Sequence, residues 1–310
     1  MDTLNNPIFI LGCVRSGTTL IRSILNSHPN IVVPRETSFF HLVDEFKKLV
    51  LKEKYSPNAF WNWYKENRRF KYLHLEVSKI QAKLDSLNKF TFKDILDTIM
   101  IEILFESKKL RWCEKTPGHE LFLEKILKWY PNAKIIFLIR DPRSVSASLK
   151  QTPWGRQHVL VHIKRWKSSA RVFIKNMENK NVLLVKYEDL VSNTENQVSN
   201  ICNFLNEKFE YNIIRNRDSG FKSNVTDGWT SKYESEVLRP ISELSINKWE
   251  VSLDEMEKYA IRTFCKSELA FFGYLNEETD RNVKLLIKCY ISGIKYFFKT
   301  KINNVRSSIK

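Results

Sequence analysis

Near the N-terminus stands the stretch Pro7-Ile-Phe-Ile-Leu-Gly-Cys-Val-Arg-Ser-Gly-Thr-Thr-Leu20, in which an apolar run ends at a glycine. Residues 8–11 have the pattern of a short strand that is buried on both faces. From Leu20 onwards, apolar residues recur at the spacing of a helix. A strand, a glycine-bearing turn and a helix start direct several backbone N–H groups and the positive end of the helix dipole towards one point. The stretch therefore predicts a site for a phosphate or a similar oxyanion.

The side chains of this turn suit the same kind of ligand. Ser16, Thr18 and Thr19 add hydroxyl donors, and Arg15 adds a planar cation next to them, with Gly17 in the same turn. An ordinary strand-to-helix turn with a serine N-cap remains an alternative, because short glycine motifs often occur without a bound ligand.

Four further segments read as strands that alternate with helical patterns along the chain. The segments lie at 31–33, 110–115, 134–140 and 182–185. The helical spacing predicts helices at 38–51, 120–129, 141–150, 158–177, 188–205 and 253–272. Such alternation is typical of a parallel sheet with helices on both faces, so we expect an α/β fold with three layers.

The domain organisation follows from the same pass along the chain. We expect one domain over residues 1–278, with a helical insertion at about 55–107 and a mobile loop at about 207–240. Residues 279–310 read as a separate basic, amphipathic tail. In its part 281–301, lysines gather on one side of a helix and large apolar residues cover most of the rest. Such a helix fits an anionic membrane, a partner, or the surface of its own domain equally well.

The composition sets broad limits on partners and compartment. The 51 Lys and Arg residues against 35 Asp and Glu give a net charge of +16, which favours a polyanionic partner without choosing one. Basic and aromatic residues are not interleaved as in a nucleic-acid platform, so we expect no nucleic acid. Five scattered cysteines and the absence of a basic-then-apolar leader favour a reducing compartment, and we expect a cytoplasmic protein.

The loop differs from that of nucleotide triphosphatases. Their motif is Gly-x-x-x-x-Gly-Lys-Ser/Thr, in which the lysine reaches the terminal phosphates and the hydroxyl binds Mg²⁺. Here Thr18 stands at the lysine position, and the cation lies three residues earlier, at Arg15. No apolar strand ends convincingly in the carboxylate that would hold a metal ion. The sequence therefore disfavours a kinase or an ATPase and predicts no bound metal.

A second anion-binding group follows the most apolar strand, in Ile139-Arg-Asp-Pro-Arg-Ser-Val-Ser-Ala-Ser148. Arg140 ends that strand, and Ser148 lies about two turns into the next helix. An Arg–Asp pair that caps this helix is the alternative. Two anion-binding groups on neighbouring strands, separate from each other, indicate a ligand with two phosphate-like groups.

These two motifs, in this order and separation, resemble those of the sulfotransferases that use 3′-phosphoadenosine 5′-phosphosulfate (PAPS), and most of all the branch of tyrosylprotein and carbohydrate sulfotransferases. The resemblance covers about residues 7–272. It implies a P-loop-like nucleotide site, PAPS as co-substrate and transfer without a metal ion. By this resemblance the 5′-phosphosulfate is bound by Arg15, Ser16, Gly17, Thr18 and Thr19. The 3′-phosphate is bound by Arg140 and Ser148.

The resemblance also implies the catalytic groups. Glu36, just beyond the end of the second strand, corresponds to the general base of this branch, if burial raises its pKa towards neutrality. Lys115 corresponds to the lysine beside the transferring sulfuryl group, and Arg15 stabilises charge with it. His119 stands two residues too late to match the histidine base of cytosolic members, and we rank it well below Glu36. A helix N-terminal carboxylate is the alternative role for Glu36.

A late segment resembles the part of the family that folds over the nucleotide. It contains Ser245 and Lys248, with Trp249 or Trp229 as adenine-stacking surfaces that are equally explained as core residues. The expected reaction is sulfuryl transfer to a hydroxyl, or less favourably an amine, of a small-molecule, glycan or lipid acceptor. A P-loop small-molecule kinase and a non-catalytic polyanion-binding protein are the alternatives.

Overall fold

Five parallel strands form the centre of the protein, in the order β2-β3-β1-β4-β5. The computed structural model describes residues 6–217, 239–275 and 282–308. The strands are β1 (Ile8–Gly12), β2 (Ile31–Val32), β3 (Arg111–Lys115), β4 (Lys134–Ile139) and β5 (Val182–Lys186). All five coincide with the predicted strands, and the predicted α/β fold is confirmed.

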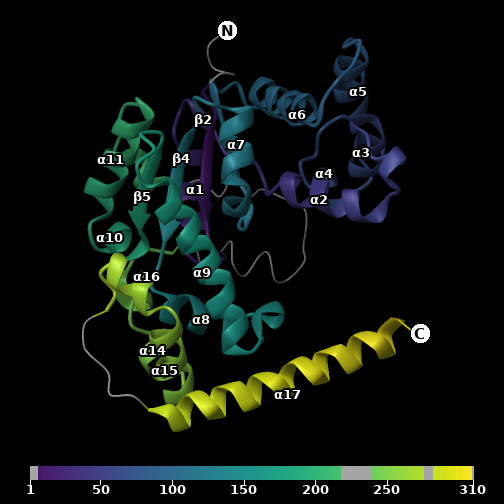
Figure 1. Ribbon diagram of the computed structural model, residues 1–310. Helices are drawn as coiled ribbons and strands as arrows, with labels where there is room; N and C mark the ends of the chain where they lie inside the picture. Colours follow the sequence, from purple (N-terminus) through teal and green to yellow (C-terminus); the bar gives the residue numbers. More distant parts are fainter. Residues whose placement is uncertain (1–5, 218–238, 276–281, 309–310) are drawn as a thin grey trace.

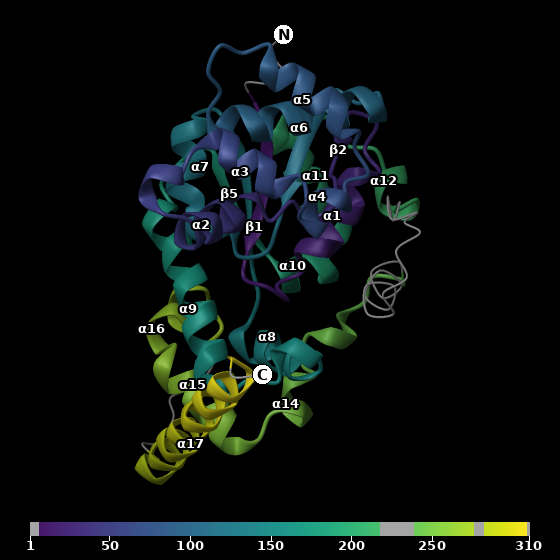
Figure 2. The same cartoon turned by 90° about the vertical axis from the view of Figure 1, so that its right-hand side faces the viewer.

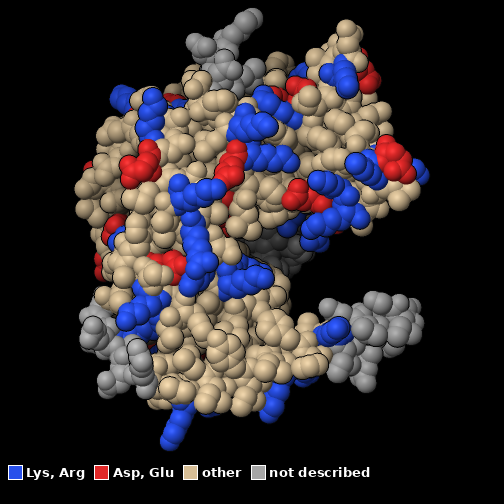
Figure 3. All heavy atoms as spheres, in the orientation of Figure 1, with Lys and Arg blue, Asp and Glu red and all other residues tan. Residues whose placement is uncertain are grey.

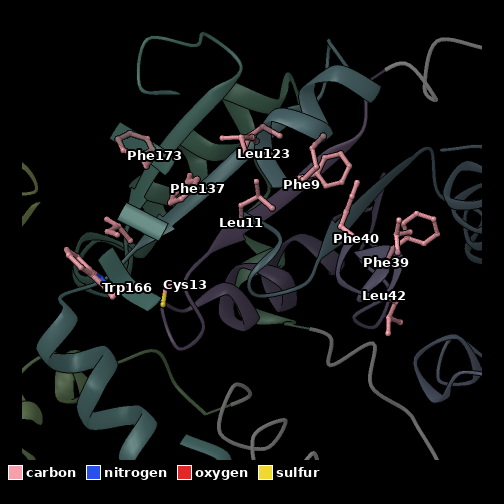
Figure 4. Packing of buried hydrophobic residues seen from close by; sticks show 14 of the residues in the cluster. Phe9, Leu11, Cys13, Phe39, Phe40, Leu42, Leu123, Phe137, Trp166 and Phe173 are labelled. Carbon is pink, nitrogen blue, oxygen red and sulfur yellow. The ribbon is translucent and has the colours of Figure 1, made fainter. Parts of the chain in front are cut away.

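The alternation of side chains along β1 divides the core into two layers. Phe9 and Leu11 belong to one apolar cluster, whereas Ile8 and Ile10 belong to the other. Figure 4 shows Phe9, Leu11 and Phe137 within the first cluster, together with side chains from several helices. β1 and β4 are apolar along almost their whole length, as expected of strands with both faces covered by helices.

The layer on the Ile8 side contains the helix that follows β1 and its loop, and the helices that follow β5. These are α1 (Thr18–Asn26), α10 (Tyr187–Ser192), α11 (Thr194–Leu205) and α12 (Asn212–Arg215). The opposite layer includes α2 (Phe39–Leu49), α6 (Phe92–Ser107), α7 (Leu123–Trp129), α8 (Pro142–Lys150) and α9 (Val159–Asn176). Figure 2 shows α1 and α12 on one side of the strands and α2 and α7 on the other.

Residues 55–107 hold four helices: α3 (Pro57–Tyr64), α4 (Arg68–Lys71), α5 (Val77–Asp85) and α6. Their aromatic side chains extend the core beyond the sheet, because Phe39 of α2 packs edge-on against Phe60 and Tyr64 of α3. Figure 1 shows α2 to α5 as a lobe beside the strands. This lobe belongs to the long connection from β2 to β3, so its loops reach the edge where the strands end.

Two predicted helices are each divided in the structure. The prediction over 188–205 is broken at Asn193, whose φ of −138° and ψ of 61° lie outside the helical region. The prediction over 253–272 separates at Cys265 into α15 (Glu255–Phe264) and α16 (Lys266–Phe271). A capping box of Asp254 and Glu257 sets the start of α15. Periodicity located these helices but missed both breaks.

The remaining elements lie near the C-terminus and in short turns. The 3₁₀ turns span Lys52–Lys54, His119–Phe122, Pro153–Gly155 and Glu243–Ser245, and α14 spans Trp249–Ser252. The tail forms one helix, α17 (Val283–Ser308), which packs on α15 and then extends away from the body (Figure 1). The expected boundary near residue 278 and most of the expected loop, 218–238, lie outside the described residues.

Gly12 lies where the backbones of β1 and β4 approach each other closely. It has a φ of +144°, and a Cβ there would lie 2.4 Å from the carbonyl oxygen of Leu138 in β4. Gly273 also has a positive φ, +72°, but a Cβ there would meet Lys186 Nζ only at 3.6 Å. We expect Gly12→Ala to lower the free energy of unfolding by about 3 kcal/mol or more, and Gly273→Ala by about 1 kcal/mol.

Urea titrations followed by circular dichroism measure both changes. Equal losses in the two variants would show that backbone conformation alone, and not the contact with β4, makes Gly12 necessary.

Candidate active site

The strands end at a cavity of about 1580 Å³. Its lining contains two carboxylates, Glu36 and Glu120, against a much larger set of cations. The cations are Arg15, Arg22, Arg35, Arg68, Arg69, Lys115, Arg140, Lys164, Arg165, Arg239 and Lys248. In the view of Figure 3, basic side chains gather along the hollow between the lobe of α2 to α5 and the lower part of the molecule. The cavity therefore favours an anionic ligand.

The loop after β1 turns sharply into α1. Arg15 has a φ of +71° and Gly17 a φ of +95°, and the N–H of Ser16 donates to the carbonyl of Cys13 over 3.1 Å. Gly17 occupies the N-cap of α1 without a side-chain hydrogen bond, so the alternative of a serine N-cap is wrong. The first N–H groups of α1 are left for a ligand or for water.

Tyr187 explains why position 17 must be glycine. A Cβ on Gly17 would lie 2.4 Å from Cδ2 of the Tyr187 ring, which follows β5. Thr18 and Thr19 line the cavity next to this contact. Ser16 does not line it: its hydroxyl is buried and has no hydrogen-bond partner among the described residues. The predicted loop residues thus divide into a cavity-lining group and one buried serine.

The two predicted anion-binding groups touch each other. Arg15 Nε donates to Ser148 Oγ over 2.9 Å, and an amino group of Arg140 donates to the carbonyl of Arg15 over 3.2 Å. Arg15, Arg140 and Ser148 all line the cavity. The two groups are therefore neighbours in one cavity, because β1 and β4 are adjacent strands that end side by side.

Arg140 is held by aromatic and backbone contacts. Its guanidinium lies 4.1 Å from the centre of the Tyr187 ring and donates to the carbonyl of Ser245 over 2.8 Å. Burial lowers the pKa of Arg140 from its usual value. Its Nε is buried and has no hydrogen-bond partner among the described residues.

An Arg–Asp pair does cap α8, as in the alternative, but its arginine is Arg143, so Arg140 remains directed to other partners. Asp141 accepts from the N–H of Arg143 at the start of α8 and pairs with the side chain of Arg143 at 2.5 Å. Arg143 in turn stacks on Trp249, with its guanidinium 4.1 Å from the ring centre. Trp249 is not among the described residues that line the cavity, whereas Ser245 and Lys248 are. Trp229 lies outside the described residues.

Glu36 and Lys115 form an ion pair in the wall of the cavity. Lys115 Nζ donates to Glu36 Oε1 over 2.5 Å, and Arg69 lies 3.7 Å from the other oxygen. The side chain of Lys115 is 1% exposed and that of Glu36 is 30% exposed. Burial by itself would raise the pKa of Glu36, but the charge and hydrogen bond of Lys115 outweigh it, and the pKa is lowered. The condition attached to its role as base, a pKa raised by burial, is therefore not met while Lys115 is paired with it.

A buried carboxylate, Glu114, holds the neighbours of this ion pair in place. Its oxygens accept from Thr37 Oγ1 over 2.8 Å and from Thr116 Oγ1 over 2.6 Å, next to Glu36 and Lys115 in the chain. His119 Nδ1 lies 2.9 Å from the second oxygen. Burial opposes ionisation of Glu114, yet these partners lower its pKa. His119 is thus engaged with Glu114, and it is absent from the described cavity lining.

Sequence reasoning missed most of the cations in this cavity. Arg22 lies on α1, Arg35 just after β2, Arg68 and Arg69 on α4, and Lys164 and Arg165 on α9. On α9 the spacing of the lining residues Val161, Lys164, Arg165 and Ser168 marks one helical face. That spacing was a usable signal in the sequence. No local pattern distinguishes Arg68 from a solvent-exposed arginine.

The chain matches known proteins over most of its length. A family model described as Sulfotransferase family matches residues 7–211. A putative protein-tyrosine sulfotransferase of Caenorhabditis briggsae is 25% identical, over 80% of this chain and 82% of that protein. A protein-tyrosine sulfotransferase of Drosophila melanogaster is 21% identical over 78% of this chain, which spans only 46% of that longer protein.

Solved structures show the same fold. The sulfotransferase domain from the olefin synthase of Synechococcus PCC 7002 superimposes with a TM-score of 0.60 and 21% identity. The match covers 88% of this chain and 97% of that domain. The resemblance seen in the two sequence motifs is confirmed: the chain is an enzyme of the sulfotransferase family.

Proposed function

We propose that the protein transfers a sulfuryl group from PAPS to an acceptor hydroxyl, or less favourably to an amine. The observation that supports this is the meeting of three parts in one basic cavity. They are the helix-start loop with Arg15, the Arg140–Ser148 pair and the Glu36–Lys115 ion pair. The first two suit two phosphate-like groups of one ligand, and the third suits proton transfer.

The donor site fits a nucleotide on the evidence of its donors. The N–H groups at the start of α1, the hydroxyls of Thr18 and Thr19, and Arg15 would bind the phosphosulfate end. Arg140, with its unpartnered Nε, and Ser148 would bind the 3′-phosphate. Lys248 and Ser245 line the same cavity and would approach the nucleotide from the far side. When bound, PAPS supplies the sulfuryl group and leaves as 3′,5′-ADP.

Proton transfer would fall to Glu36. The acceptor oxygen bonds to sulfur as the bond from sulfur to the phosphate oxygen breaks, and the acceptor proton passes to the Glu36 carboxylate. Lys115 and Arg15 would stabilise the negative charge that develops on the leaving oxygen. If Lys115 turns towards the anionic donor, Glu36 loses its counter-charge, and burial then raises its pKa. Donor binding would thus convert a weak base into a stronger one.

The acceptor side of the cavity carries its own cations. Arg35, Arg68 and Arg69 line it near Glu36, and Arg35 lies 5.8 Å from the ring centre of Tyr72. These cations favour an acceptor with a negative group close to its hydroxyl. A small molecule, a glycan or a lipid meets this description. The relatives named for protein tyrosine add a tyrosyl hydroxyl to the candidate acceptors.

Removal of Arg140 should abolish most nucleotide binding. We expect isothermal titration to show binding of 3′,5′-ADP without Mg²⁺, and Arg140→Ala to weaken it by about 10- to 100-fold, because hydrogen bonds to a charged group are lost. Arg156→Ala is the matched control, since Arg156 is exposed and does not line the cavity. Tighter binding of ATP with Mg²⁺ than of 3′,5′-ADP would favour a kinase and overturn the proposal.

Glu36→Gln should separate chemistry from binding. The amide keeps the shape of the side chain but cannot accept the proton, so we expect kcat to fall by about 10²–10⁴-fold while 3′,5′-ADP affinity stays within the error of the titration. Glu243→Gln is the control, because Glu243 is an exposed residue of the 3₁₀ turn beside the cavity. An unchanged kcat in Glu36→Gln would remove Glu36 from the role of base.

Lys115→Met should raise the pKa of Glu36. Without the cation, burial is opposed only by the more distant Arg69 and Arg22, and the pKa should rise above its usual value of 4.5. Carbon-13 NMR of the Glu36 carboxyl over a pH series measures the change, with Lys248→Met as the control.

The same ion pair predicts an effect on stability. Because the folded pKa of Glu36 is depressed, the pair stabilises the wild type above pH 4.5, and this contribution is lost as the pH falls through the folded pKa.

For the NMR measurement, a pKa of Glu36 that stays low in Lys115→Met would show that the ion pair with Lys115 is not the cause of the lowered pKa.

A further inference from the structure

The helix α17 has three distinct sides. One side packs on the body: Cys289 is fully buried, Ser292 Oγ lies 2.8 Å from His158 Nε2, and a Cβ on Gly293 would lie 2.9 Å from Leu160. The Tyr290 ring also meets Phe264 of α15, with 5.6 Å between the ring centres. These contacts fix the orientation of the helix, and they therefore determine which residues its other two sides present.

The second side is apolar and exposed. Its members are between 49% and 65% exposed and lie within an arc of about 120°, at about 100° per residue. They are Val283, Ile287, Ile291, Ile294, Phe297 and Phe298. Figure 1 shows that the C-terminal half of α17 extends away from the rest of the chain. Most large apolar side chains of a soluble domain surface occur singly, so a continuous row of this kind marks an interaction surface.

The third side is a row of lysines. Lys284, Lys288, Lys295 and Lys299 are exposed and lie within about 60° of each other, directly beside the apolar side. Residues 281–310 contain no Asp or Glu at all. The surface therefore combines apolar area with positive charge that no acidic residue of the same helix offsets.

We propose that this face of α17 docks the protein on an anionic lipid bilayer. The isoleucines and phenylalanines would enter the boundary between head groups and acyl chains, and the lysine row would contact the anionic head groups. No helix in the described parts of the chain is long and apolar enough to cross a membrane, so the helix would lie on the surface. A second copy of the chain is a poorer fit, because pairing two copies would bring both basic helices together with no acidic residue in 281–310 to offset their charge. The proposal does not depend on the proposed reaction.

Co-sedimentation of the full chain with vesicles tests the proposal. We expect binding to vesicles of phosphatidylcholine and phosphatidylglycerol in equal parts, and much weaker binding to phosphatidylcholine alone. The double variant Ile294→Asp/Phe298→Asp should lower the bound fraction at least about tenfold, because it removes apolar area and adds negative charge. The matched control is Leu49→Asp/Phe105→Asp, at two exposed apolar positions elsewhere on the surface.

Three outcomes would overturn the proposal. One is equal binding by the Ile294→Asp/Phe298→Asp variant and the wild type. Another is equal binding to neutral and anionic vesicles, which would remove the role of the lysine row. The third is a concentration-dependent dimer in light scattering that the same double variant abolishes, because the face would then cover a second copy. Circular dichroism of each variant confirms that a lost interaction does not reflect a lost fold.

Discussion

The parallel pairing of β1 with β4 is the constraint from which the geometry of the site follows. Their register sets Gly12 opposite Leu138, so both strands end at the same level. The loop after β1 and Arg140 after β4 are therefore neighbours, although they are far apart in the sequence. The hydrogen bonds from Arg15 to Ser148 and from Arg140 to the carbonyl of Arg15 join them. A ligand at this edge meets one continuous set of donors, which is the usual position for ligands of open parallel sheets.

The concentration of cations around this edge is unfavourable for the empty protein. Lys115 and Arg140 are almost fully buried, and burying a charge is costly unless a partner compensates for it. Glu36 compensates Lys115, while the Tyr187 ring and the Ser245 carbonyl compensate Arg140. Such partners suffice to keep the fold but leave the cavity strongly positive. An anionic ligand would relieve this imbalance, which is why the site is better explained by ligand binding than by stability.

The sequence predicted the strands and the two anion-binding motifs because both depend on local patterns. A buried parallel strand is an unbroken apolar run, and the loop at 12–19 carries its glycines at fixed offsets. The contact between Arg15 and Ser148 could not be predicted, because it depends on the order of the strands in the sheet. The cations from α4 could not be predicted either, because their position in the cavity depends on the tertiary structure. The lowered pKa of Glu36 could not be predicted either, because its cause is Lys115 at the end of β3, which is far from Glu36 in the sequence. The role of Trp249 could not be predicted, because a single tryptophan in a sequence looks the same whether it packs in the core, stacks on an arginine or stacks on a nucleotide base.

Glu114 shows how the fold positions Glu36 and Lys115, the pair proposed to take part in the reaction. Its side chain points to the opposite side of β3 from its neighbour Lys115, as alternation along a strand requires. One carboxylate oxygen accepts from both Thr37 and Thr116, which joins the segment after β2 to the segment after β3. The hydroxyl of Tyr64 adds a 3.0 Å hydrogen bond to the carbonyl of Thr37 from the lobe of α2 to α5. Buried groups that contact the neighbouring residues Thr37 and Thr116 thus hold Glu36 and Lys115 in position. Their own atoms can therefore exchange partners within the cavity while the backbone that carries them stays in place.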